Sequence, residues 1–360
     1  MGAAFSRRWA RSPVVLGQRS CWSEGDLIQS RGRPYAGLTF KSSTTGMSER
    51  TSRRKVFDFG VYAIMRVAVF AVQMLPWVAI RCLARIISRL GYMIDRRHRL
   101  IAQDNIRHAF PEFNELEIQR LSRASFGHLV LMVFEVIRFP RIVNETNLDD
   151  YFRYACPESG ERVVKFMESG RPLMVLTGHF GNWEVFNYVA GIAGHPANVI
   201  ARRLDNPYVD RFIEDIRCKT GQRILDKRYD FSLMLDALER HEILGMLGDQ
   251  DAGPKGQFVE FFGRPASTYK SIALLSLKYS APILVFGAAR IGQPMQYHLY
   301  LEDVILPEDY VGHPAAIEEI TQRYSDAVQR MVLRHPDQYF WFHRRWKSKP
   351  RIKRYDRKAA

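Results

Sequence analysis

The sequence predicts an α/β protein, in which a layered sheet is flanked by helices and preceded by an N-terminal membrane-associated helix. From about residue 160, helical segments alternate with short apolar strands, which is the pattern of a layered α/β sheet. Upstream, residues 59–80 form an apolar segment in which Arg66 is the only charged residue. This segment is long enough to cross a bilayer, and it accounts for the predicted membrane-associated helix.

Charge is distributed unevenly along the 360 residues, whose formal net charge is +15. Residues 1–55 hold 11 basic residues and three acids, residues 343–360 hold nine and one, and the part between is close to neutral. Basic ends suit an anionic membrane, nucleic acid or an acidic protein. Zinc-finger spacing, a helix-turn-helix pattern and RNA-binding aromatic motifs are absent from the sequence, so nucleic acid is not an expected partner. The four cysteines are scattered without a CxxC pair, which favours a reducing compartment over a zinc site or disulfides.

Residues 1–46 are rich in Arg, Ser and Gly and show little apolar periodicity. A basic segment that is poor in acids has the composition of a targeting peptide. We favour a different interpretation, in which translation starts at Met47 and residues 1–46 are a disordered tail or an error in the assigned start.

Residues 56–97 are expected to form a helical membrane anchor. Arg66 and Pro76 weaken the apolar segment as a spanning helix, so a spanning and an interfacial helix both stay open. The continuation is a basic amphipathic helix, which suits an anionic surface but would also fit a surface helix packed on the body. Its three arginines occupy one face and its aliphatic residues the opposite face: Arg81, Arg85 and Arg89 against Leu83, Ile86, Ile87 and Leu90.

Residues 98–350 are predicted to form the globular body, followed by a basic tail over residues 351–360. Helices over residues 98–140 should break near "NIRHAFPEF", and a long amphipathic helix is expected in "IEEITQRYSDAVQRMVLRHPDQ". The predicted strands are "PLMVL", "ANVIAR", "QRILDK", "EILGMLGDQ", "APILVFGAAR" and "QYHLYLEDVIL".

The stretch "LTGHFGNWE" places His179 between two glycines, directly after a predicted strand. Ligands of α/β sheets usually bind at the carboxyl ends of strands. The turn into the next helix should leave the backbone N–H groups of Gly181 and Asn182 without partners, as donors for a developing oxyanion.

A carboxylate, Glu184, follows His179 by five positions, which is about 140° on a continuous helix. The two side chains can meet only if the chain turns between them, and the glycines permit such a turn. A carboxylate bonded to one imidazole nitrogen fixes the tautomer, so the other nitrogen can take a proton from a hydroxyl. Because the sequence contains no G-x-S-x-G motif, a catalytic His179 would act on a substrate hydroxyl directly. The alternative is a structural histidine at a strand end.

Further charged candidates follow in the sequence. Residues 245–267 place Asp249 and Asp251 in a loop after a strand, with Glu260 further on. No calcium-loop spacing follows, so we predict no metal site, and a glycine-rich turn with capping acids is the other interpretation. Arg202 and Arg217 are able to hold phosphate groups bidentately, although each could equally be a solvated charge.

Taken together, four motifs resemble the late acyltransferases of lipid A biosynthesis, within a wider group that includes mycobacterial phosphatidylinositol mannoside acyltransferase. In order, they are "GHFGNWE", which is an H-x4-[D/E] motif, "ARRLDNP", "DQDAG…FVEFFGRPA" and "HPDQYFWFHRRWKSKP". The resemblance implies a glycerolipid-acyltransferase-like fold. It also implies that His179 is the base, that Glu184 is its partner, and that Arg202 or Arg217 stabilises an acceptor phosphate or the thioester. Asp249, Asp251 or Glu260 would support the site.

The resemblance further implies acyl transfer from a thioester of acyl carrier protein or CoA to a hydroxyl of a lipid A precursor, without another cofactor. The expected partners are acidic acyl carrier protein and anionic membrane lipid, with the catalytic domain on the cytoplasmic side of the inner membrane. In the last motif, Trp341 and Trp346 are expected at the membrane interface, with the neighbouring cations on phosphates. Three alternatives stay open: another phosphorylated or glycosylated lipid as acceptor, a thioesterase or lipid hydrolase, and a non-catalytic membrane-binding scaffold.

Overall fold

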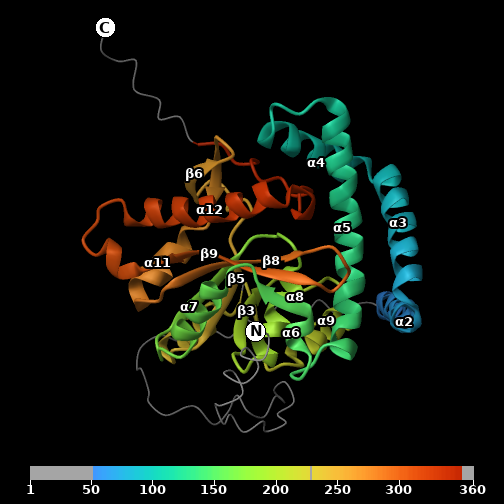
Figure 1. The fold of residues 1–360 in the computed structure, drawn as a ribbon, viewed down its shortest axis with the longest axis horizontal. Coiled ribbons are helices and arrows are strands. Elements are labelled where there is room, and N and C mark those ends of the chain that lie inside the picture. The colour runs from blue at the N-terminus through green and yellow to red at the C-terminus, as the bar shows by residue number, and fades with distance from the viewer. Residues whose placement is uncertain (1–51, 228, 351–360) are drawn as a thin grey trace.

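The computed structural model describes residues 52–227 and 229–350, so the extension over residues 1–46 and the basic tail over residues 351–360 lie outside the described residues. Figure 1 shows a sheet with helices packed against it and with a long helical arm on one side. The α-helices are α2 (Ser52–Met74), α3 (Trp77–Ile94), α4 (Arg96–Ala109), α5 (Glu115–Ile142), α6 (Leu148–Tyr151), α7 (Pro157–Met167), α8 (Trp183–Ile192), α9 (Pro207–Cys218), α10 (Phe231–Glu239), α11 (Lys270–Tyr279) and α12 (Ala316–Arg334). Short 3-10 helices are η1 (Pro307–Tyr310) and η2 (Pro336–Gln338).

The main sheet confirms the predicted α/β class. Its seven strands lie in the order β1-β9-β8-β2-β5-β3-β4, and a separate hairpin joins β6 to β7. Every pair in the main sheet is parallel except β8 with β9. The strands are β1 (Phe152–Tyr154), β2 (Leu173–Thr177), β3 (Ala197–Ala201), β4 (Arg223–Asp226), β5 (Ile243–Leu247), β6 (Gln257–Phe261), β7 (Arg264–Thr268), β8 (Ile283–Arg290) and β9 (Tyr297–Ile305).

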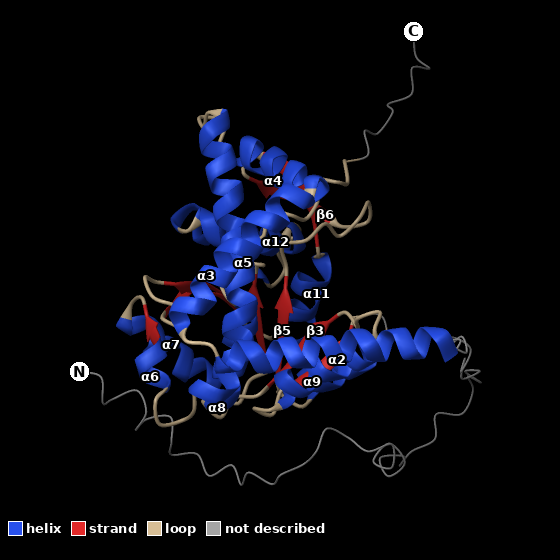
Figure 2. Cartoon of the chain, turned by 90° about the vertical axis from the view of Figure 1, so that its right-hand side faces the viewer, coloured by secondary structure: helices blue, strands red, loops and turns tan. Residues whose placement is uncertain are grey.

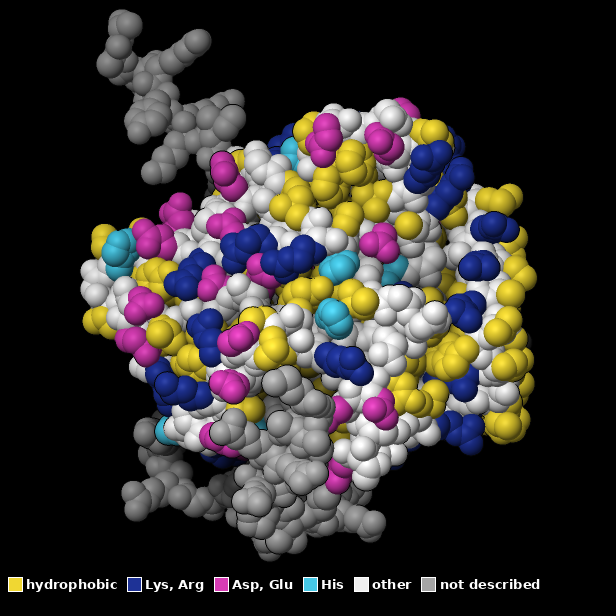
Figure 3. Space-filling view, in the orientation of Figure 1, with side chains coloured by type: hydrophobic (Ala, Val, Ile, Leu, Met, Phe, Trp, Pro, Cys, Tyr) yellow, Lys and Arg dark blue, Asp and Glu magenta, His cyan; other side chains and the backbone are white. Residues whose placement is uncertain are grey.

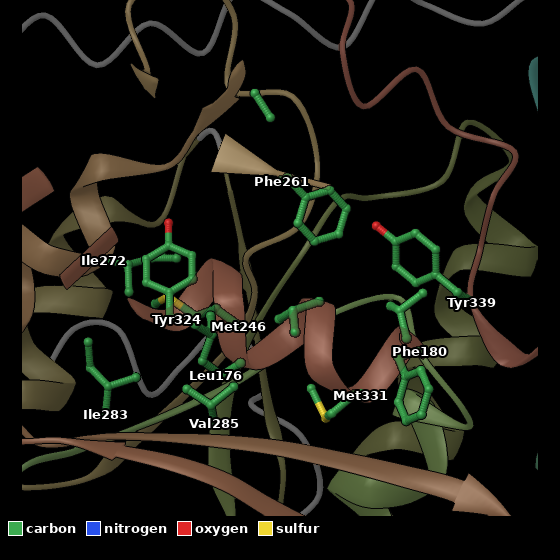
Figure 4. Close-up of a cluster of buried hydrophobic side chains, with 14 of the residues drawn as sticks. Leu176, Phe180, Met246, Phe261, Ile272, Ile283, Val285, Tyr324, Met331 and Tyr339 are labelled. Atoms are coloured by element: carbon green, nitrogen blue, oxygen red, sulfur yellow. The ribbon is translucent and has the colours of Figure 1, made fainter. Parts of the chain in front are cut away.

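Helices cover both faces of the sheet, which explains why its central strands are continuous apolar runs. In β2, Leu176 packs into the core beneath α12, whereas its neighbour Val175 packs on the opposite face against Val163 of α7. Figure 4 shows the larger core, in which Tyr324 and Met331 of α12 meet side chains from the sheet. Because both faces are buried, the carboxyl edge of the parallel strands is left for a functional site.

The anchor region folds as two helices, and the boundary between them lies within the apolar segment over residues 59–80 rather than after it. Pro76 separates α2 from α3, since proline cannot supply the N–H that a continuous helix needs. Of the described helices, α2 is the one that is long and apolar enough to cross a membrane. On α3, Ile86 and Leu90 are exposed, as are Arg85 and Arg89, and the face that packs against α5 is a different one.

The C-terminal motif corrects an expectation. Trp341 and Trp346 do not lie at a surface: their exposed fractions are 0% and 8%, and Trp341 donates its indole N–H to the carbonyl of Pro336 at 2.7 Å. Arg345 is 1% exposed, and its guanidinium donates to the carbonyl of Ser267 at 2.7 Å. The aromatic rings of this motif pack between α4 and the β6–β7 hairpin. They are therefore part of the core and do not form an aromatic belt at a membrane interface.

Candidate active site

Two neighbouring parallel strands bring His179 and Asp249 together. β2 and β5 pair with Thr177 opposite Leu247, and His179 and Asp249 each lie two residues beyond those positions. The register therefore places both side chains at the same point on the carboxyl edge of the sheet, although they are 70 residues apart in the sequence.

The contact between His179 and Asp249 defines the tautomer of the imidazole. Nδ1 of His179 lies 2.7 Å from Oδ1 of Asp249, and the backbone N–H of His179 donates to Oδ2 at 2.8 Å. An ionised carboxylate only accepts hydrogen bonds, so Nδ1 carries the proton and Nε2 keeps its lone pair. Burial alone would raise the pKa of Asp249, but the His179 imidazole and N–H hold it well below its usual range.

Two glycines make this contact possible. A Cβ on Gly178 would lie 2.8 Å from Val328 and 3.2 Å from Oδ2 of Asp249, so a side chain there would push the carboxylate away. Gly181 has a φ of +59°, and a Cβ there would lie 1.9 Å from the carbonyl oxygen of Ala288. The sharp turn between β2 and α8 therefore requires both glycines of the motif.

The predicted contact between Glu184 and the imidazole is wrong. The imidazole of His179 contacts Asp249, and Glu184 contacts Arg217. Helix α8 begins at Trp183, so Glu184 lies in its first turn and faces α9. There Arg217 binds it bidentately, with N···O distances of 2.9 and 2.5 Å. The side chains of Glu184 and Arg217 are 22% and 26% exposed, so the pair is partly accessible. A role for either residue in the reaction stays a prediction.

A cavity of about 310 Å³ lies beside this ion pair. Apart from Glu184, Arg217 and Asn187, the lining is apolar and comes from α2, α5, α8 and α9, including Met65 and Val136. Trp183, one residue before Glu184, packs its ring 5.2 Å from the imidazole of His179. The site thus combines a histidine–aspartate pair, an arginine–glutamate pair and an apolar cavity whose lining includes that second pair.

The backbone donors expected at Gly181 and Asn182 are not free. The N–H of Gly181 donates to the carbonyl of Gln338 at 2.8 Å, and the N–H of Asn182 donates to the carbonyl of Ala288 at 2.9 Å. The side chain of Asn182 caps α8 by accepting from the N–H of Val185. These two N–H groups are therefore bonded to β8 and to the C-terminal segment, and they are not available to an oxyanion as the sequence pattern suggested.

Comparison with known proteins identifies the family. The family model for bacterial lipid A biosynthesis acyltransferases matches residues 50–348. The chain belongs to this family. It is similar to the lipid A biosynthesis lauroyltransferase of Escherichia coli K12, at 23% identity over 78% of this chain and 90% of that protein. It is also similar to the palmitoleoyltransferase of that strain, at 24% identity over 73% and 84%, and to the Haemophilus influenzae lipid A biosynthesis acyltransferase, at 24% over 71% and 80%.

The resemblance of the four motifs is thereby confirmed, and the chain is an acyltransferase. The remaining predicted site residues of this lipid A acyltransferase family member lie apart from the imidazole. Asp251 accepts from the N–H and the hydroxyl of Ser348, both at 3.1 Å, which ties the C-terminal segment down. Glu260 is exposed on β6, and Arg202 is exposed in the loop after β3, 4.0 Å from Asp205. Their part in the reaction stays a prediction.

Sequence reasoning missed two residues that contact the acyltransferase's histidine–aspartate pair. The side-chain nitrogen of Gln250 lies 3.2 Å from Nε2 of His179, where an amide N–H meets the imidazole lone pair. His343 places Nε2 at 3.1 Å from the backbone carbonyl of Asp249 and Nδ1 at 2.7 Å from that of Phe340. Their positions in the sequence could have indicated them, because Gln250 is adjacent to Asp249 and His343 belongs to the last family motif.

A buried polar network holds the turn that carries His179. Both carboxylate oxygens of Glu135, which is fully buried on α5, accept from Arg290 at 2.6 Å. Arg290 also lies 3.1 Å from Nδ1 of His128, whose Nε2 is 2.9 Å from the carbonyl of Gly181. Burial, together with the charge on Arg290, lowers the pKa of His128 to about 3, so its ring is neutral and donates through Nε2.

Proposed function

We propose that the chain transfers a fatty acyl group from a thioester of acyl carrier protein or CoA to a hydroxyl of a lipid A precursor. The observation that carries this proposal is the His179–Asp249 pair, whose geometry leaves the lone pair on Nε2, together with an apolar cavity lined in part by Glu184, the neighbour of the Trp183 that packs on the imidazole. The reaction would take place at the cytoplasmic side of the inner membrane, where acyl carrier protein and CoA are available.

In the proposed step, Nε2 of His179 takes the proton of the acceptor hydroxyl while that oxygen attacks the thioester carbonyl carbon. The new C–O bond forms, and the C–S bond then breaks. The imidazolium, stabilised by ionised Asp249, returns its proton to the departing thiolate. Gln250 occupies the position at Nε2 that the hydroxyl would take, so it has to yield when the acceptor binds.

The developing oxyanion needs donors other than Gly181 and Asn182. We infer that the backbone N–H groups of Trp183 and Glu184 serve this purpose. They are the first two N–H groups of α8, and the side chain of Asn182 caps the next one, that of Val185. The first N–H groups of a helix have no intrahelical partner, and the helix dipole there favours negative charge. The ring contact of Trp183 with His179 supports their proximity to the base.

The apolar and the charged lining residues of the cavity suit the hydrocarbon chain and the thioester group of an acyl donor. The apolar walls fit a hydrocarbon chain, and the Glu184–Arg217 pair in the lining gives Arg217 a fixed orientation toward an anionic or carbonyl group. The basic terminal segments fit both acidic acyl carrier protein and an anionic acceptor lipid.

Incubation of the purified full chain with a lipid A precursor and either acyl–acyl carrier protein or acyl-CoA tests the proposal. Mass spectrometry should show a precursor that has gained one acyl chain, with one free thiol released for each transfer. Release of free fatty acid without acylated lipid would instead make the chain a thioesterase. Intact thioester after incubation with both donors would favour a membrane-binding scaffold.

The cavity predicts a change in donor preference. In Met65→Trp, the larger side chain should fill part of the cavity and lower kcat/KM for the longest accepted donor, by about tenfold or more for each methylene displaced. Shorter donors should be affected less. A donor series from eight to sixteen carbons measures the shift, with Leu274→Trp, at an exposed position of α11, as the matched control. An unchanged chain-length profile in Met65→Trp would remove the acyl chain from this cavity.

A further inference from the structure

Helices α2 and α3 carry a concentration of exposed apolar side chains. Of the 25 exposed large hydrophobic residues in the described part of the chain, 14 lie on these two helices. They include Phe57, Val67 and Phe70 on α2, and Met93 and Ile94 on α3. Figure 3 shows hydrophobic side chains along the edge that α2 and α3 occupy in Figure 1, with a column of Lys and Arg beside them. An apolar surface of this extent, rimmed by cations, marks a binding face, and we call it the α2–α3 face.

The excess of positive charge on α2 and α3 selects an anionic surface. Residues 52–94 contain seven basic residues and one acid, and that acid, Asp58, is only 8% exposed. Arg85 and Arg89 are exposed among the apolar side chains of α3. A lipid surface with negative head groups satisfies both the apolar and the basic side chains, because the former enter the acyl region while the latter remain with phosphates.

The body holds α2 close to both of its ends. The backbone carbonyl of Asp58 accepts from Asn206, the N-cap of α9, at 2.9 Å. Seventeen residues further on, the carbonyl of Leu75 accepts from Arg138 of α5. At 1.5 Å per residue, these anchor points are about 25 Å apart along the helix axis. Figure 2 shows α2 lying lengthwise across the molecule, and Figure 1 shows the same helix end-on beside α3.

Contacts at both ends are incompatible with a helix that crosses the bilayer. A crossing helix has lipid around it over about 30 Å, so α9 and the end of α5 would enter the hydrocarbon together with α2. Helix α9, which packs on α2 through Tyr208 and Phe212, carries Asp210, Arg211 and Glu214. Charged side chains in hydrocarbon are costly, whereas a helix lying flat keeps α9 above the membrane.

We propose that α2 and α3 lie in the plane of an anionic membrane surface, with the α2–α3 face embedded in one leaflet. The opposite side of α2 forms a wall of the apolar cavity through Met65 and Val69. One helix therefore separates the leaflet from the cavity, and in this proposal a fatty chain moves from the leaflet into the cavity along the edge of α2. Only this passage rests on the proposed function; the orientation of α2 and its binding to lipid do not.

Vesicle binding tests the membrane face. The double variant Val67→Asp/Phe70→Asp, whose side chains are 70% and 63% exposed, should bind vesicles of phosphatidylethanolamine and phosphatidylglycerol (3:1) at least tenfold more weakly than the wild type. Val311→Asp, at an 84% exposed apolar position on the body, is the matched control and should bind like the wild type. Unaltered thermal unfolding shows that both variants fold. Equal vesicle binding by the double variant and the control, or equal wild-type binding to pure phosphatidylcholine, would overturn the proposal.

Depth measurements separate a flat helix from a crossing one. Phe57→Cys and Met74→Cys, in a full chain whose native cysteines are replaced by serine, each receive a fluorophore near one end of α2. Quenching by spin-labelled lipids should place both labels at the same shallow depth. Depths that differ by the thickness of the hydrocarbon would establish a crossing helix and contradict the proposal. Neither measurement requires turnover, so failure of acyl transfer would leave this inference standing, and the reverse also holds.

Discussion

Replacement of His179 by alanine is expected to lower kcat for acyl transfer by about 10²–10⁴-fold or more, because the acceptor hydroxyl loses its general base. Asp249→Asn should have an effect of similar size, since an amide that donates to Nδ1 forces the proton onto Nε2 and abolishes the base. The expected change lies in kcat rather than KM, and thioester consumption with lipid product analysis measures both. Turnover close to that of the wild type in His179→Ala would dismiss the mechanism.

Two further variants make this result interpretable. His179→Gln keeps a polar side chain near buried Asp249, so it controls for the destabilisation of about 1–3 kcal/mol that an unpartnered buried group causes in His179→Ala. Glu184→Gln separates the two carboxylates. Because Glu184 is bonded to Arg217 and not to the imidazole, its loss should raise KM more than it lowers kcat. A kcat in Glu184→Gln as low as that of Asp249→Asn would restore Glu184 as the partner of His179.

The sequence was sufficient for the class of fold and for the position of His179 at the edge of the sheet, because both depend on local patterns. Apolar strands between helices predict a layered α/β sheet, and a histidine between glycines after a strand lies at the edge where ligands bind. Glu184 was assigned to the imidazole because it is close in the sequence. The actual partner is set by the pairing of β2 with β5, a contact between distant segments that spacing alone does not reveal.

The other errors share that origin. Trp341 and Arg345 look like an interfacial motif because aromatic and basic residues alternate there, but α4 and the β6–β7 hairpin enclose them. The N–H groups of Gly181 and Asn182 look free in a turn, but β8 and the C-terminal segment accept from both. In each case the local sequence pattern suggested an exposed side chain or a free N–H group, but a segment remote in the sequence buries it or accepts its hydrogen bond. The orientation of α2 also depends on remote partners, namely α9 and α5.

The second large effect is expected at Glu135, which supports the turn without touching the reacting groups. In Glu135→Gln, Arg290 would lose the carboxylate that neutralises it in a site where its own side chain is only 10% exposed. Breaking one partner of a buried ion pair typically costs about 3–5 kcal/mol in the free energy of unfolding. The midpoint of urea unfolding should fall accordingly, without a change in the denaturant slope m.

A double variant shows why the pair is costly to break. In Glu135→Leu/Arg290→Met both charges are gone, so no buried charge is left without a counter-ion, and the free energy of unfolding should fall by less than the sum of the two single losses. The hydrogen bond from His128 to Gly181 would then lose its support, because Arg290 no longer holds the Nδ1 side of the ring. We therefore expect the double variant to regain stability while its kcat stays below that of the wild type. If the single losses simply add, or if kcat recovers together with stability, the network does not position the turn that carries His179.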